Sequence, residues 1–178
     1  MNVAPALAKV AVGIVVARRK ADSPWIDFTW KPVAALAGLP DAAPWTVLSQ
    51  DPDGVTFYAG AAEIELYRTE TTNYRDNLGS SAPMLWVALR QTGVEPPYEV
   101  FAVTADPAEG EAWTEAGSDL VDVVPMPETI RATIDAFVAE HRPPPPGRRR
   151  RARFHPTRRP ASSPLLPLTH VCGATSGR

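Results

Sequence analysis

The sequence has one cysteine, Cys172, and three histidines among its 178 residues. A single cysteine excludes an intrachain disulfide, and it also excludes a zinc or iron–sulfur site with four thiolate ligands. The histidines, His141, His155 and His170, lack the short spacing that metal ligands have. We therefore expect this chain alone to bind no metal ion and no other cofactor.

A long hydrophobic run is also missing. The apolar stretch from Val10 to Ala17 is too short to span a bilayer. The positive cluster Arg18, Arg19 and Lys20 follows this stretch instead of preceding it, and no small-x-small cleavage site comes after it. We interpret the stretch as a buried strand, and we expect a cytoplasmic protein that does not contact a membrane.

Acidic residues are missing from the end of the chain. Residues 143–178 contain eight arginines and no Asp or Glu, a charge of +8. Residues 1–142 contain ten Lys or Arg and twenty Asp or Glu, a charge of −10. Composition thus predicts a single α+β domain over residues 1–142 and a disordered Pro/Arg-rich tail over residues 143–178.

Several interpretations of the tail stay open. Its arginine run, residues 148–153, would bind RNA, DNA or anionic lipid through charge alone, or fold back onto the acidic domain. The abrupt change near Arg142 is also typical of a shifted reading frame in GC-rich coding DNA. Nucleic acid is not expected to bind the rest of the chain, because that part is acidic.

Most of the acidic domain has the pattern of β-strands. Residues 9–20 are apolar on both faces, which indicates an interior strand, and Asp-Pro-Asp-Gly at residues 51–54 predicts a hairpin turn. A second strand is predicted over residues 25–33. In it, Ile26, Phe28 and Trp30 alternate with polar residues and are expected to face the core.

The five tryptophans are Trp25, Trp30, Trp45, Trp86 and Trp113. A platform that stacks nucleic-acid bases needs basic residues beside it, and this domain is acidic. We therefore interpret the tryptophans as core residues, except that Trp25 falls on the polar face of its strand and is expected to be partly exposed.

Two helices are predicted late in the domain. Asp106 fits the N-cap of the first, Pro107 its first turn and Gly117 its C-terminal stop. The second helix begins at Pro127. Its apolar stripe at helical spacing consists of Ile130, Ile134, Phe137 and Val138. The whole pattern predicts an α+β fold, with a mostly antiparallel sheet of about seven strands, curled or sandwich-like, and two C-terminal helices.

Residues 69–81 are the most polar stretch of the domain and are a candidate site for a small polar ligand or a partner. The candidate residues are Glu70, Thr71, Tyr74, Arg75 and Asn77. The alternative is a solvated connection whose side chains cap their own backbone.

No catalytic residue is predicted. Glu63, Glu65 and Glu70 are candidates for acid–base chemistry, but they have no histidine or nucleophile motif near them. Glu63 and Glu65 share a strand face that is also typical of plain solvent-facing charges. Residues 35–40 contain one glycine and no following lysine, so they do not match a phosphate-binding loop.

Several ordered segments resemble a known family. They are VGIVVARR, PWIDFTWKPVA, APWTVL, YAG…IELYRTETTNYRDNL, VFAVTADPAEGEAW and VVPMPETI…FVAEH. Over roughly residues 10–142 the chain is similar to an uncharacterised bacterial family, domain of unknown function 3305. Members of that family are encoded beside molybdenum-dependent formate dehydrogenases and their maturation factors, and some carry the label of molybdopterin-guanine dinucleotide biosynthesis. The family offers no catalytic residue to transfer.

The resemblance implies a role near formate dehydrogenase and its maturation, but it implies no particular chemical reaction. We expect a non-enzymatic accessory protein that binds a formate dehydrogenase subunit or maturation factor, or takes part in molybdenum cofactor handling. The alternative is an enzyme of molybdopterin-guanine dinucleotide biosynthesis, although residues 35–45 lack the repeated glycine and the lysine that hold a nucleotide triphosphate. Nucleic-acid binding through the tail is a third interpretation.

Overall fold

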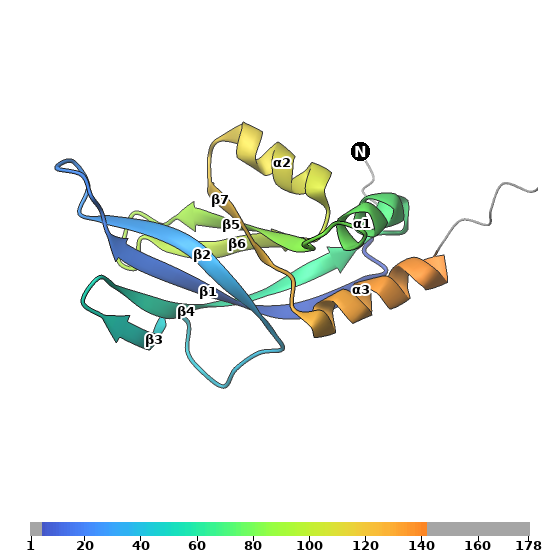
Figure 1. Ribbon diagram of the computed structural model, residues 1–178, viewed down its shortest axis with the longest axis horizontal. Coiled ribbons are helices and arrows are strands. Elements are labelled where there is room, and N and C mark those ends of the chain that lie inside the picture. Colours follow the sequence, from blue (N-terminus) through green and yellow to red (C-terminus); the bar gives the residue numbers. More distant parts are fainter. Residues whose placement is uncertain (1–4, 142–178) are drawn as a thin grey trace, which may run out of the picture. The chain divides into compact units, whose positions relative to one another are not determined.

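The computed structural model describes residues 5–141. The predicted tail, residues 143–178, therefore lies outside the described residues. The described part contains seven strands, three α-helices and one short 3-10 helix, η1 (Figure 1). The strands are β1 (Ala8–Lys20), β2 (Phe28–Ala37), β3 (Thr46–Asp51), β4 (Gly54–Leu66), β5 (Met84–Gln91), β6 (Tyr98–Thr104) and β7 (Leu120–Pro125). The helices are η1 (Arg68–Glu70), α1 (Thr71–Leu78), α2 (Pro107–Ala116) and α3 (Glu128–His141).

All seven strands belong to one sheet, with the order β2-β1-β4-β6-β5-β7 and with β3 paired to β4. The prediction of a mostly antiparallel sheet of about seven strands is confirmed, but the sheet is mixed, because β4 and β6 run parallel. The sheet curls until its outer strands β2 and β7 approach each other. Lys31 Nζ of β2 lies 3.3 Å from Asp122 Oδ2 of β7. The curled form is therefore the correct one of the two predicted forms, and the sheet is nearly a barrel.

The core fills the inside of this curl. Residues 12–17 of β1 are buried on both faces, as the apolar run predicts. α3 lays its apolar stripe into the same core, and its four predicted members are all buried, namely Ile130, Ile134, Phe137 and Val138. Burial of such a side chain stabilises the fold by about 1.5–3 kcal/mol. α3 is therefore attached to the sheet by the residues that its helical spacing predicts.

α2 covers the opposite face of β5, as Figure 1 shows. Its ends match the sequence signals. The Asp106 side chain accepts a hydrogen bond of 2.8 Å from the backbone N–H of Ala108, and Gly117 ends the helix with a φ of 67°. Because Gly has no Cβ, it adopts this left-handed conformation without a steric penalty.

The sequence predicts two helices, but the described residues contain three α-helices. The additional one is α1, because residues 71–78 are helical and do not form an irregular connection. The helix is short, no side chain caps its N-terminus, and polar residues dominate it, so its sequence carries little helical signal. Tertiary packing supplies the stability instead. Tyr74 and Leu78 are buried, and the Tyr74 ring meets the Phe137 ring of α3 edge-to-face with 6.3 Å between centroids.

The prediction that Ile26 and Phe28 face the core is also wrong. Ile26 is 52% exposed and lies in the loop before β2, and Phe28, the first residue of β2, is 46% exposed. Trp25 is 90% exposed, which confirms and exceeds its expected exposure. Trp30 is partly buried, and its ring lies 5.9 Å from that of Tyr98 on β6, across the inside of the curl. Alternation thus grouped Phe28 correctly with Trp30, since the Arg18 guanidinium lies over both rings, but it did not predict that Ile26 precedes the strand or that Phe28 is exposed.

Candidate functional site

The parallel seam between β4 and β6 opens into a groove. The two strands share one bridge and then separate, so that residues 61–63 of β4 and 100–103 of β6 form the walls of a hollow of about 290 Å³. α2 contributes Glu109 and Trp113 to the rim. Glu63, Glu65 and Tyr67 line the β4 side.

A second hollow of about 400 Å³ adjoins the first and shares Tyr67 and Glu109 with it. It lies between η1 with α1 on one side and the start of α2 on the other. Its remaining lining residues are Thr69, Glu70, Asn73, Tyr74, Asp106 and Ala108. We call the two hollows together the acidic groove, because five carboxylates line it. They are Glu63, Glu65, Glu70, Asp106 and Glu109.

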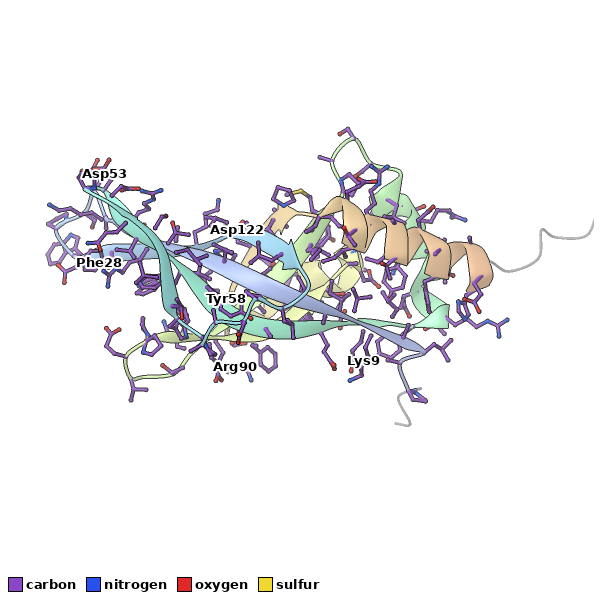
Figure 2. The ribbon with its side chains drawn as sticks, turned by 90° about the horizontal axis from the view of Figure 1, so that it is seen from below. Lys9, Phe28, Asp53, Tyr58, Arg90 and Asp122 are labelled. Carbon is purple, nitrogen blue, oxygen red and sulfur yellow. The ribbon has the colours of Figure 1, made fainter. Side chains whose placement is uncertain are left out.

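At the β4 end of the groove, one lysine links two of the glutamates. Lys9 Nζ lies 2.9 Å from Glu63 Oε2 and 2.9 Å from Glu65 Oε1. The Tyr67 hydroxyl donates a hydrogen bond to the other carboxylate oxygen of Glu65. Figure 2 labels Lys9 near the end of β1 that carries this cluster.

These contacts fix the protonation states of the cluster. The hydrogen bond from Tyr67, followed by that from Lys9, holds the pKa of Glu65 below its usual value, and the same bond to Glu65 raises the pKa of Tyr67. Glu63 and Glu65 raise the pKa of Lys9. At neutral pH, Glu65 is therefore ionised and Tyr67 is protonated. A general acid or base works best with a pKa near the working pH, so neither residue is tuned for that role.

At the other end of the groove, an amide holds two carboxylates together. Asn73 Nδ2 donates to Glu70 Oε2 at 3.2 Å and to Asp106 Oδ2 at 2.9 Å. Asp106 is buried and uses its other oxygen to cap α2. The bond between Asn73 and Asp106 thus joins α1 to the start of α2 and fixes this wall of the groove.

The structure separates the five predicted site residues. Glu70 and Tyr74 line the groove, whereas Arg75 points to solvent on the other side of α1, 3.5 Å from Asp76. Thr71 is buried and its hydroxyl donates to the backbone carbonyl of Arg68 at 3.2 Å. The predicted set therefore does not form one site.

Asn77, the fifth predicted residue, has a structural role. Its side-chain amide donates to the carbonyls of Met84 and Ala105, both at 2.8 Å, and its oxygen accepts from Met84 N–H at 3.1 Å. These bonds tie α1 to the start of β5 and to the segment that follows β6. This outcome agrees with the alternative that the side chains of this stretch satisfy nearby backbone groups.

Most groove residues were not among the predicted site residues. Those with polar or aromatic side chains include Tyr67, Asn73, Asp106, Glu109 and Trp113. The helix-capping pattern had already explained Asp106, and nothing in the sequence places α2 against the β4–β6 seam. The signal available in the sequence was the concentration of acidic residues in two separate stretches, residues 63–70 and 106–111.

Two negative findings apply to residues 5–141 alone. No helix in this range is both long enough and apolar enough to cross a membrane. The same range holds no group of three or more His, Cys, Asp or Glu side chains that are placed to bind a metal ion.

The fold and the groove define a mixed α+β protein with a curled sheet and an acidic groove beside its second α-helix. A family model described as "Protein of unknown function (DUF3305)" matches residues 11–151, and the chain belongs to this family. No curated protein and no solved structure matches the chain. Membership in domain of unknown function 3305, which the ordered segments of the sequence indicated, is thereby confirmed.

Proposed function

We propose that the chain is a non-enzymatic accessory protein that binds a basic segment of a partner protein in the acidic groove. The observation that carries the proposal is the groove itself, which five carboxylates line and in which Lys9 pairs with only two of them, Glu63 and Glu65. Opposite charge speeds association and selects the partner. The partner in this proposal is a formate dehydrogenase subunit or a maturation factor that handles the molybdenum cofactor, as the family resemblance implies.

The aromatic residues of the groove support a partner that carries Lys or Arg. Trp113 and Tyr67 line the same hollow as Glu65 and Glu109. A cation over an aromatic ring gains about 0.5–2 kcal/mol. The chain already makes this contact at the groove wall, where the Arg90 guanidinium carbon lies 3.2 Å from the centroid of the Phe101 ring.

The protonation states in the groove support binding over catalysis. Ionised Glu65 and protonated Tyr67 present a fixed negative charge and a hydrogen-bonding hydroxyl, and neither changes its state near neutral pH. Binding by such a site is expected to weaken as salt concentration rises, because exposed charges are screened over about 8 Å at physiological ionic strength.

The alternative is an enzyme of molybdopterin-guanine dinucleotide biosynthesis. Its substrate would include a nucleotide triphosphate, and the carboxylates of the groove repel such a polyanion. Residues 35–45, which lack the glycine and lysine pattern of a triphosphate-binding loop, begin with the end of strand β2. The residues from Gly38 to Asp41 that follow it are exposed. Nucleic-acid binding through residues 143–178 would use a segment outside the described residues.

The test is an affinity capture with the full-length chain from cells that express formate dehydrogenase, followed by mass spectrometry. Glu109→Lys reverses a charge in the groove, and Glu111→Lys makes the same change on the same helix outside the groove. We expect the parent and Glu111→Lys to retain a dehydrogenase subunit or maturation factor, and Glu109→Lys to lose it. Equal loss in both variants would indicate unspecific charge attraction. Recovery of neither protein class by the parent would contradict the proposal.

A further inference from the structure

At the end of the sheet far from the acidic groove, the tips of two hairpins meet. The backbone N–H of Lys20, at the end of β1, donates to the carbonyl of Asp53 in the β3–β4 turn at 3.1 Å. Figure 2 labels Phe28 and Asp53 at this end of the sheet, opposite Lys9. A hollow of about 180 Å³ lies between the two tips, and Arg18, Lys20 and Gln50 are among the residues that line it.

Aromatic rings fix the position of the Arg18 side chain at this hollow. Its guanidinium carbon lies 4.6 Å from the ring centroid of Phe28, 5.6 Å from that of Phe57 and 5.7 Å from that of Trp30. Trp30 and Phe57 are themselves stacked, with 5.9 Å between their centroids. The guanidinium is therefore held in place before any ligand arrives, which lowers the entropy that binding would cost.

One donor of the Arg18 side chain, its Nε–H group, nevertheless has no hydrogen-bonding partner among the described residues. Its Nε is buried and makes no hydrogen bond within the part of the chain that the structure describes. Its neighbour Arg19 donates from Nη1 to both carboxylate oxygens of Asp51, at 3.0 and 2.9 Å. Arg90 donates from Nε and Nη2 to the two oxygens of Asp119, at 3.1 and 3.0 Å. No carboxylate of residues 5–141 takes the corresponding place beside Arg18. Aromatic rings attract the charge of a guanidinium but leave its in-plane N–H groups without an acceptor, and a buried donor without an acceptor is costly.

We propose that the hollow between the hairpin tips binds a carboxylate group, with Arg18 as the principal contact and Lys20 as a second positive charge. A carboxylate matches the planar fork of an arginine and forms two parallel hydrogen bonds with it. The proposal concerns a different part of the sheet from the acidic groove and does not depend on the function proposed for that groove.

The other charges at the hollow favour a carboxylate over a phosphate. Asp51 and Asp53 also line it, and Asp51 is already neutralised by Arg19. The charge of Asp53 remains and repels any anion at the rim. A dianionic phosphate suffers about twice the repulsion of a singly charged carboxylate at the same distance, because Coulomb energy scales with charge.

A carboxylate reaches this hollow either as a free small acid or on an acidic side chain of another protein. Two exposed apolar residues, Trp25 and Ile26, lie on the loop just before Phe28. They offer contact surface that a small acid leaves unused and that the apolar neighbours of an acidic side chain would cover. The two sources therefore differ in the affinity that each is expected to show.

The test is a titration of the full-length, isotope-labelled chain, followed through the NMR signal of the Arg18 Nε–H group, whose burial slows its exchange with water. The probes are sodium acetate, the blocked peptide acetyl-Leu-Glu-Leu-amide and its Gln counterpart, with sodium chloride and sodium phosphate at matched ionic strength. We expect a saturable shift with acetate and with the Glu peptide, and none with the Gln peptide or chloride. Tighter binding of the Glu peptide than of acetate assigns the site to an acidic protein segment, and equal binding assigns it to a free small acid.

Arg18→Lys keeps the charge and removes the fork, so it is expected to weaken binding by about tenfold or more, measured on the backbone signals around residue 54. Arg131→Lys on α3, where Arg131 is an exposed residue near Glu128, is the matched control and should bind like the parent. Three results would overturn the proposal. They are the absence of a saturable shift with both carboxylates in the parent, tighter binding of phosphate than of acetate, and unchanged affinity in a folded Arg18→Lys variant.

Discussion

Gly110 of α2 lies against the side chain of Trp86 on β5. A Cβ atom at position 110 would stand 2.1 Å from Cγ of the indole and 2.6 Å from its Cβ, well inside van der Waals contact. Glycine in the interior of a helix costs about 1 kcal/mol relative to alanine. The close approach of the helix to Trp86 explains why this helix contains one. It also places Glu109 and Trp113 of the same helix at the rim of the groove.

We predict that Gly110→Ala destabilises the protein although alanine favours helices. The new methyl group would push α2 away from β5, and such overpacking costs about 1–3 kcal/mol. Urea unfolding measures the difference. In a Trp86→Leu background, which makes room at this contact, the same substitution should cost less. A stability gain from Gly110→Ala in the parent would show that α2 does not pack as closely as described.

Asn77→Ala should destabilise the protein strongly. The substitution removes the partner of the buried carbonyl of Ala105 and of the partly buried N–H and carbonyl of Met84. Each unsatisfied buried group costs about 1–3 kcal/mol, and we expect a total loss of about 2–4 kcal/mol in chemical denaturation. Arg75→Ala, on the exposed side of the same helix, is the control and should change stability by less than about 0.5 kcal/mol. Similar effects of both substitutions would contradict a structural role that is specific to Asn77.

Trp30 and Trp25 form a matched pair for a test of the core boundary. Trp30→Ala should cost about 3 kcal/mol, because its ring packs against Trp45, Phe57 and Tyr98. Trp25→Ala should leave the unfolding midpoint almost unchanged, because the Trp25 side chain is almost fully exposed. An unchanged midpoint for Trp30→Ala would mean that the aromatic cluster contributes nothing to the fold.

We predict that the protein loses stability at alkaline pH, because the phenol of Tyr74 is buried. Burial of its phenol raises the pKa to about 12 from an ordinary value of 10.0, so the folded protein holds this proton more tightly than the unfolded chain does. The resulting stabilisation is complete below pH 10 and is lost as the pH rises towards 12, with a total of about 3 kcal/mol. Urea unfolding between these two pH values should show this fall in the parent. It should be shallower in Tyr74→Phe, which lacks the Tyr74 phenol. Equal slopes would exclude Tyr74 as the source.

Local patterns determined much of this protein. The β-branched run of β1, the hairpin turn at residues 51–54, the caps of α2 and the apolar stripe of α3 are all found where the sequence predicts them. Each of these signals depends on residues close together in the chain, either through turn and cap chemistry or through the period of one element. The order of segments also identified the family before the fold was known.

The formation of α1 and of the acidic groove depends on tertiary contacts and could not be predicted from local sequence patterns. α1 is helical because Tyr74 meets Phe137, which lies more than sixty residues later in the chain, and because Asn77 satisfies backbone groups at the start of β5 and just after β6. The groove exists because β4 and β6 separate after one bridge while Gly110 lets α2 come close to the sheet. The partners in these contacts come from distant parts of the chain, and local periodicity holds no information about such contacts. The sequence by itself therefore determined the elements and the family, whereas long-range packing decided which polar side chains share a site.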